Sequence, residues 1–180
     1  KRIAKTDTND ISAHISIGQI YTKLKKFKLA IESLEPIKSR HPNNIRALEA
    51  LAELFYKMGN LDRSITEYRN ILEQSPKHLP SYIQLGWVYY RKGEFQMATA
   101  WTKRGLKLGT PSPKITLLAD MNLGLYSWLN GDHASAKNFY RNALAKESEH
   151  IIKAILDDLK KTTRLFPKRT EASFFTGWVY

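Results

Sequence analysis

A period of 34 residues constrains what this sequence can fold into more than any other feature. Small residues recur at that interval as Gly18, Ala52 and Gly86. The interval also separates three further columns, which are Tyr21, Phe55 and Tyr89; Ala30, Ser64 and Ala98; and Pro42 and Pro76. A fixed period of roughly 20–50 residues is the signature of stacked supersecondary units. The sequence therefore predicts a repeat architecture, in which each copy buries its apolar face against its neighbours.

Two further copies follow the strictly periodic part. Gly124 and Tyr140 keep the internal spacing of a repeat, but they come four residues late, after the turn-rich stretch 109–113. The final residues, Gly-Trp-Val-Tyr at 177–180, duplicate the residues at 86–89. We therefore expect the chain to stop inside a fifth repeat of a longer protein. Apolar side chains at Phe174, Phe175 and Trp178 would then lack a covering helix, which predicts self-association.

Each copy is expected to contain two helices. Apolar residues at Leu48, Leu51 and Phe55 have the 3,4 spacing of one helical face, and a second face follows the turn at 59–60. The first copy has Lys25 at the corresponding turn, so it lacks the residue that adopts positive φ at low cost. Pro36 lies within the second helix of that copy and is predicted to kink it.

The repeats divide the whole chain into segments. The predicted division is an N-terminal extension at 1–10, repeats at 11–44, 45–78, 79–116 and 117–150, an inserted amphipathic helix at 151–169, and the first half of a fifth repeat at 170–180. The third repeat carries an extended loop at 109–114.

The columns resemble those of the tetratricopeptide repeat. In the third copy, Tyr82, Leu85, Gly86, Tyr89 and Ala98 match the family pattern of large, small and aromatic positions. This resemblance covers about residues 11–150 and the segment at 170–180. It implies an all-α, right-handed superhelix (an α-solenoid) of antiparallel helix pairs. It also implies a scaffold for another protein, as an assembly or adaptor module of a larger protein.

The sequence favours a binding protein over an enzyme. It contains no cysteine, which excludes a disulfide framework and thiolate chemistry, and which fits either cytosol or periplasm. Its five histidines include no pair at the i,i+4 spacing of a helical metal site. Glu49 and Glu53 share one helical face, a pattern that we interpret as solvated surface. We therefore predict no catalytic residue, no metal and no cofactor.

The resemblance also implies a groove lined by the first helix of each repeat. The early groove positions are polar and mixed in charge, with Gln19, Glu49, Glu53, Tyr56 and Lys57 among them. The later positions are apolar and predict a surface for a partner peptide or amphipathic helix. This predicted groove set is Ile83, Trp87, Tyr90, Arg91, Met121, Leu125, Trp128, Phe174 and Trp178. The alternative is that Trp87 and Trp128 pack on neighbouring first helices.

Positive charge supplies the other candidate surface. Lys23, Lys57 and Arg91 end the first helices of three successive copies, where cations compensate the helix dipole or form a basic rim for an acidic partner. The chain has 29 Lys and Arg against 17 Asp and Glu, a net charge of +12. That charge leaves RNA binding as the alternative function. Attachment to an anionic membrane surface is a third alternative.

Overall fold

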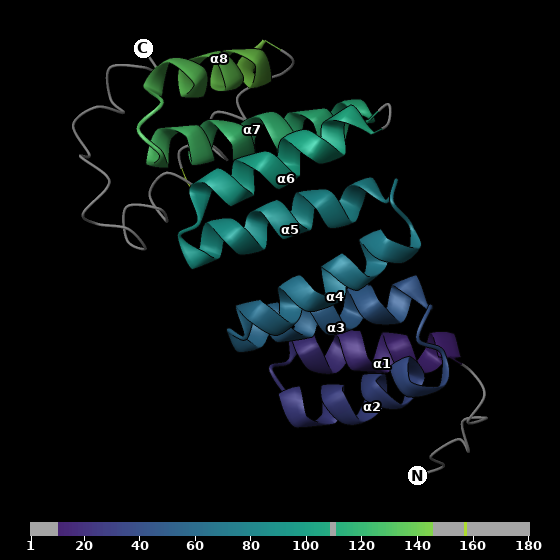
Figure 1. The fold of residues 1–180 in the computed structure, drawn as a ribbon. Helices are drawn as coiled ribbons and strands as arrows, with labels where there is room; N and C mark the ends of the chain where they lie inside the picture. The colour runs from purple at the N-terminus through teal and green to yellow at the C-terminus, as the bar shows by residue number, and fades with distance from the viewer. Residues whose placement is uncertain (1–10, 109–110, 146–156, 158–180) are drawn as a thin grey trace.

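The computed structural model describes residues 11–108, 111–145 and 157, and the described residues form eight helices and no strand (Figure 1). The helices are α1 (Ile11–Lys23), α2 (Phe27–Arg40), α3 (Ile45–Met58), α4 (Leu61–Gln74), α5 (Leu79–Lys92), α6 (Phe95–Lys107), α7 (Pro113–Leu129) and α8 (His133–Leu144). They stack one after another from α1 and α2 at one end to α8 at the other. The predicted all-α helical-repeat solenoid is confirmed. The inserted helix and the fifth repeat lie outside the described residues.

Packing follows chain order. Each odd-numbered helix packs against the even-numbered helix that follows it, and each even-numbered helix packs against the next odd one. The backbones of α1 and α3 also approach closely, whereas α3 and α5 leave a cleft between them. Because every helix contacts mainly its sequence neighbours, the fold has the near one-dimensional organisation of a solenoid.

The turns inside the helix pairs use left-handed backbone. Gly59, Gly93 and Gly131 have φ values of 82°, 81° and 84°, as the sequence pattern indicated. Among the described residues, Lys25 is the one non-glycine residue with positive φ, at 57°. A side chain in this conformation brings its Cβ close to the following carbonyl oxygen and costs roughly 1–2 kcal/mol. The turn between α1 and α2 is therefore strained where the other turns are relaxed.

Substituting Lys25→Gly is expected to stabilise the chain. The loss of left-handed strain exceeds the extra backbone entropy that glycine gives the unfolded chain, so the free energy of unfolding should rise by about 0.5–1 kcal/mol. Urea denaturation followed by circular dichroism measures this. Lys28→Gly is the matched control, because Lys28 is an exposed residue inside α2, where glycine is expected to destabilise the helix. A Lys25→Gly variant no more stable than the parent would contradict the argument.

Helix α2 runs continuously from Phe27 to Arg40 with Pro36 inside it, so the proline does not end the helix. Its outer surface is tied to the next pair by side chains. Lys38 Nζ donates to Glu67 Oε1 at 2.5 Å, and Glu67 is 3% exposed. Arg63 Nη2 donates to Glu35 Oε1 at 3.2 Å on the exposed side. The exposed Arg63–Glu35 pair contributes at most about 1 kcal/mol, whereas the Lys38–Glu67 pair satisfies the charge of a buried carboxylate.

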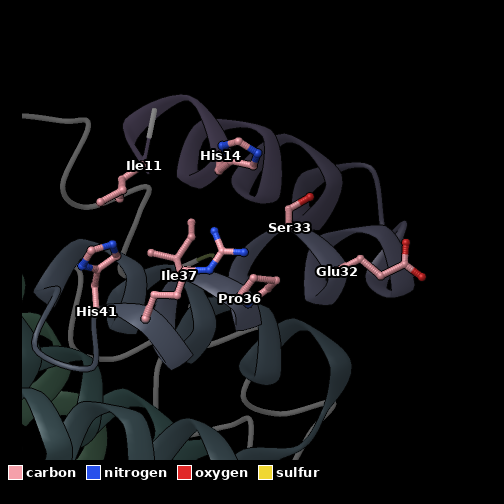
Figure 2. A pocket seen from close by; sticks show the side chains of 8 residues that line it. Ile11, His14, Glu32, Ser33, Pro36, Ile37 and His41 are labelled. Atoms are coloured by element: carbon pink, nitrogen blue, oxygen red, sulfur yellow. The ribbon is translucent and has the colours of Figure 1, made fainter. Parts of the chain in front are cut away.

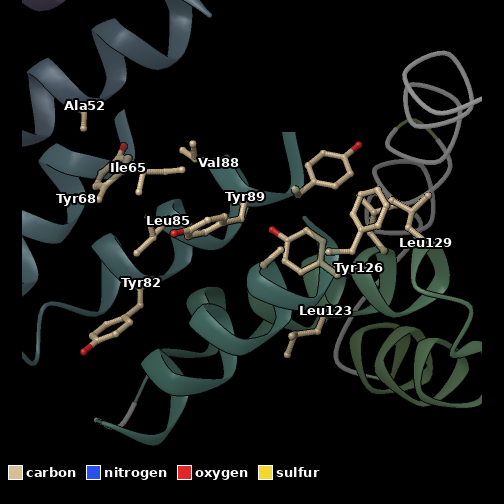
Figure 3. Close-up of a cluster of buried hydrophobic side chains, with 14 of the residues drawn as sticks. Ala52, Ile65, Tyr68, Tyr82, Leu85, Val88, Tyr89, Leu123, Tyr126 and Leu129 are labelled. Carbon is tan, nitrogen blue, oxygen red and sulfur yellow. The ribbon is translucent and has the colours of Figure 1, made fainter. Parts of the chain in front are cut away.

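Two clusters of buried side chains form the core. The first is built from α1, α2 and α3, with Leu34 and Phe55 at 0% exposed. The second runs from α3 to α8, and Figure 3 shows its side chains converging from successive helices. Small residues let the helices of a pair approach, because a Cβ placed on Gly86 would clash with Thr102 Oγ1. The columns of small residues, Gly18, Ala52 and Gly86 and Ala30, Ser64 and Ala98, are thus packing positions.

No helix in the described part of the chain is both long and apolar enough to cross a membrane.

Candidate functional site

A cleft of about 600 Å³ opens between α3 and α5. Side chains from α1 and α4 complete its walls. We call it the α3–α5 cleft, and its lining residues are Gln19, Glu49, Glu53, Tyr56, Lys57, Tyr68, Pro80, Gln84, Trp87 and Val88. These residues come from three successive helix pairs. The cleft therefore exists because the helices stack, and a single repeat could not form it.

The aromatic part of the cleft is held in place by a hydrogen bond across it. Trp87 Nε1 on α5 donates to Tyr56 Oη on α3 at 2.8 Å. The Trp87 ring also lies 4.8 Å, centroid to centroid, from the buried ring of Tyr90. Both cleft rings remain partly exposed. Trp87 and Tyr56 thus present fixed aromatic surface to a ligand, at low entropic cost on binding.

Two carboxylates stand on the α3 wall. Glu49 and Glu53 are one helical turn apart, so their side chains leave the same face. Glu49 Oε1 lies 3.7 Å from His78 Nε2. Glu53 is half-buried and makes no hydrogen bond or ion pair with any residue that the structure describes. Its charge is therefore directed at the cleft and not neutralised by a partner side chain.

Tyr68 reaches the cleft from the outer helix α4. Its side chain is 6% exposed and lines the cleft, and within the described structure its hydroxyl has no hydrogen-bond partner. Burial raises the pKa of Tyr68 well above its usual value, and the charges of Glu53 and Glu49 raise it further. The carboxylates thus create a negative potential that extends to the cleft wall at Tyr68.

Family comparisons agree with this architecture. Two models described as tetratricopeptide repeat match the chain, one over residues 46–78 and the other over residues 11–37. The chain contains tetratricopeptide repeats. Such repeats generally act as non-catalytic scaffolds for other proteins, and the family does not by itself name a partner.

Curated relatives of this tetratricopeptide-repeat protein are much longer than the matched chain. It is 23% identical over 145 residues to the tetratricopeptide repeat protein 21 homolog of Caenorhabditis briggsae, covering 79% of the chain and 11% of that protein. It is 23% identical over 125 residues to tetratricopeptide repeat protein 8 of Caenorhabditis elegans, covering 69% of the chain and 22% of that protein. The chain thus spans about a tenth to a fifth of these relatives.

Solved structures share the tetratricopeptide-repeat fold. The chain resembles PilW, described as a widely conserved type IV pilus biogenesis factor, with a TM-score of 0.71, 20% identity, and coverage of 87% of the chain and 70% of PilW. It also resembles a thermophilic TPR protein in Thermus thermophilus, with a TM-score of 0.69, 20% identity, and coverage of 85% of the chain and 83% of that protein. At these identities the likeness establishes the fold alone.

The predicted groove residues fall into different environments. Trp87 lines the α3–α5 cleft, and Arg91 is exposed at the end of α5. Four of the set are buried, with exposures of 2–5%: Ile83, Tyr90, Leu125 and Trp128. The last three of these belong to the second core cluster. Met121 packs against that cluster and is partly exposed, while Phe174 and Trp178 lie outside the described residues. The binding role of this set stays a prediction, and the burial favours packing for Trp128.

The basic rim residues are all exposed at the ends of first helices. Lys57 Nζ and Arg91 Cζ lie 5.8 Å and 5.7 Å from the centroid of the Tyr56 ring, so two of them gather at one edge of the cleft. Lys23 stands at the end of α1. The rim role also stays a prediction.

Sequence reasoning missed four residues of the cleft lining, which are Tyr68, Pro80, Gln84 and Val88. Tyr68 is the one of them that comes from a second helix, whereas the family resemblance assigns the groove to first helices. Its place in the repeat is usually aromatic and marks packing, so nothing in the sequence distinguished it from a core residue. Glu49 and Glu53, which the family resemblance placed at early groove positions, do line the cleft.

A second pocket, of about 280 Å³, lies at the first helix pair (Figure 2). Its lining includes His14 from α1, and Glu32, Arg40 and His41 from α2 and its C-terminal cap. No group of three or more His, Cys, Asp or Glu side chains in the described parts of the chain is arranged to hold a metal ion.

Proposed function

We propose that this chain is a scaffold that holds a segment of a partner polypeptide in the α3–α5 cleft. The observation that carries the proposal is the cleft itself. It spans three helix pairs and presents fixed rings, two carboxylates and a tyrosine hydroxyl to one space. A lining that mixes aromatic surface with a few convergent polar groups is typical of a recognition site.

Exposure supports contact at the cleft rather than along the whole predicted aromatic stretch. Trp87 is partly exposed and lines the cleft, whereas Tyr90 and Trp128 are 2% and 5% exposed. A partner can contact Trp87 without rearrangement of the stack. Contact with Tyr90 or Trp128 would require core side chains to move, which costs packing free energy.

RNA binding is not favoured by any feature of the cleft. The carboxylates of Glu49 and Glu53 would lie against a phosphate backbone and repel it. Lys57 is the one lysine or arginine among the described residues that line the cleft, and Arg91 lies near its edge beside Tyr56.

Trp87→Ala is expected to weaken partner binding by about tenfold or more, as for a central aromatic anchor. Partner segments can be selected from a phage-displayed library of random peptides, each about a dozen residues long, panned on the whole chain. Their affinities for wild type and variant are then measured by fluorescence anisotropy. Trp101→Ala is the matched control, because Trp101 is also a half-buried tryptophan but lies on the outer helix α6.

The control separates binding from folding. Circular dichroism and urea denaturation should show both variants to be folded at the assay temperature. If the selected peptides bind Trp87→Ala as tightly as wild type, the cleft is not the binding site and the proposal is wrong.

A further inference from the structure

The geometry points to a cationic side chain, an arginine or lysine of the partner segment, as the group that enters the α3–α5 cleft between Glu49, Glu53 and Tyr68. This inference rests on the proposed function, because it names the chemistry of the partner at the same site. The inference concerns one side chain of the partner segment and does not specify the other residues of that segment.

The first step of the argument is charge. Glu53 is half-buried and lacks an ion-pair partner in the described structure, and Glu49 stands one turn away on the same face. Neighbouring side chains at i and i+4 have Cβ atoms about 6 Å apart, a separation that a planar guanidinium or an ammonium bridges with two charge-assisted hydrogen bonds. An anionic or purely apolar segment would leave both carboxylates desolvated and uncompensated.

The second step is independent of the carboxylates. Tyr68 lines the cleft although it is only 6% exposed, and its hydroxyl has no hydrogen-bond partner among the described residues. The hydroxyl is not among the fully enclosed polar atoms that lack a partner, so it is open to the cleft and can accept a hydrogen bond from a donor brought by a ligand. Arginine and lysine side chains bring only donors, which suits a site of two carboxylates and one hydroxyl oxygen.

The third step is the aromatic surface. The Trp87–Tyr56 hydrogen bond of 2.8 Å fixes two rings beside the carboxylates. A cation over such rings gains a further attraction from their negative faces. Tyr56 already attracts the chain's own Lys57 and Arg91, whose charges lie 5.8 Å and 5.7 Å from its ring centroid. Neither forms an ion pair with Glu49 or Glu53 in the described structure, so the carboxylates remain available.

The basic side chains near the cleft determine which of the two carboxylates lacks a partner. His78 lies 3.7 Å from Glu49, and Lys57 and Arg91 stand at the edge next to Tyr56. Glu53 has no basic side chain paired with it in the described structure, in contrast to Glu49, which lies beside the imidazole of His78. We therefore expect Glu53 to contribute more than Glu49 to the binding of the partner's cationic side chain.

The test begins with the peptides selected on the whole chain. Those whose binding needs Trp87 should share an arginine or lysine. Replacing that arginine by citrulline, which keeps its shape and loses its charge, should weaken binding by about tenfold or more. Glu53→Gln should do the same, Glu49→Gln should weaken binding less, and Tyr68→Phe should weaken it severalfold. Glu73→Gln, an exposed residue of α4 outside the cleft, is the matched control and should bind as wild type does.

A double-mutant cycle makes the assignment specific. Once Glu53 is replaced by glutamine, changing the peptide arginine to citrulline should cost little more, because both substitutions remove the same contact. Affinity of wild type for the arginine peptide should also fall as salt rises, and the fall should be smaller for Glu53→Gln.

Two negative results are distinguishable. Peptides that depend on Trp87 but tolerate citrulline and Glu53→Gln would overturn the cation proposal and leave the proposed function standing. Peptides that bind independently of Trp87 and of both carboxylates would overturn both proposals together.

Discussion

Tyr90→Ala is expected to lower the free energy of unfolding by about 3–5 kcal/mol, as for other large-to-small substitutions of buried aromatic residues. Tyr90 is 2% exposed, and its ring centroid lies 5.6 Å from that of Tyr126 on α7 and 6.2 Å from that of Phe95 on α6. Removing it would open a cavity where three helices meet. Urea denaturation followed by far-ultraviolet circular dichroism measures the loss.

Tyr56→Ala provides the comparison, because Tyr56 is only partly buried at the cleft and should cost far less stability. The outcome also bears on the predicted groove set, in which Tyr90 stands as a partner contact. A Tyr90→Ala variant that stays within about 1 kcal/mol of the parent and loses peptide binding would make Tyr90 a binding residue instead of a core residue.

Gly86→Val is expected to cost about 3 kcal/mol, at the upper end for overpacking. A Cβ at this position would overlap Thr102 Oγ1 and would lie 3.0 Å from the backbone oxygen of Ala98. The threonine can rotate away, but the carbonyl oxygen belongs to the backbone of α6 and cannot move without separating the two helices of the pair. The same urea denaturation experiment detects the loss.

Two further variants isolate the cause. Ala100→Val introduces the same side chain on the exposed face of α6 and should change stability by about 0.5 kcal/mol or less. In a Gly86→Ala background, Thr102→Ala removes the nearer clash and should recover part of the stability, a coupling that a double-mutant cycle measures. Two results together would contradict this explanation: a Gly86→Val variant as stable as the parent, and no gain in stability from Thr102→Ala in the Gly86→Ala background. They would show that the close approach of α5 and α6 does not require glycine at this position.

The fold could be predicted from the sequence because, in a solenoid, equivalent packing contacts recur in every repeat. Each column at a 34-residue interval, such as Gly18, Ala52 and Gly86, is one contact between helices of a pair, and several columns in agreement identify the unit. The left-handed turns at Gly59 and Gly93 followed from the same logic, because few residues accept that backbone. Small residues at the packing positions and glycines at the turns were therefore sufficient to predict the helix pairs.

The candidate site was less accessible to sequence reasoning. Helix α5 is apolar nearly all round. The spacing of its apolar residues identifies two apolar faces but does not predict which of them is buried by a neighbouring helix. The structure buries Tyr90 and leaves Trp87 at the cleft. The space between α3 and α5 depends on how successive pairs stack, a property of several helices together. Tyr68 and Glu53 belong to one helix pair, but the cleft that they line is completed by α5 of the next pair.

Helix α3 contributes side chains to both core clusters, and this limits which fragments of the chain can fold on their own. Leu48 and Ala52 belong to the cluster that runs to α8, while Leu51, Leu54 and Phe55 belong to the cluster shared with α1 and α2. A fragment that began at α3 would uncover those last three side chains, which are 0% exposed in the intact stack. At roughly 1.5–3 kcal/mol for each large apolar side chain, that exposure would cancel much of a small domain's stability. The first helix pair thus serves as the cover that keeps the cleft-bearing part of the protein folded.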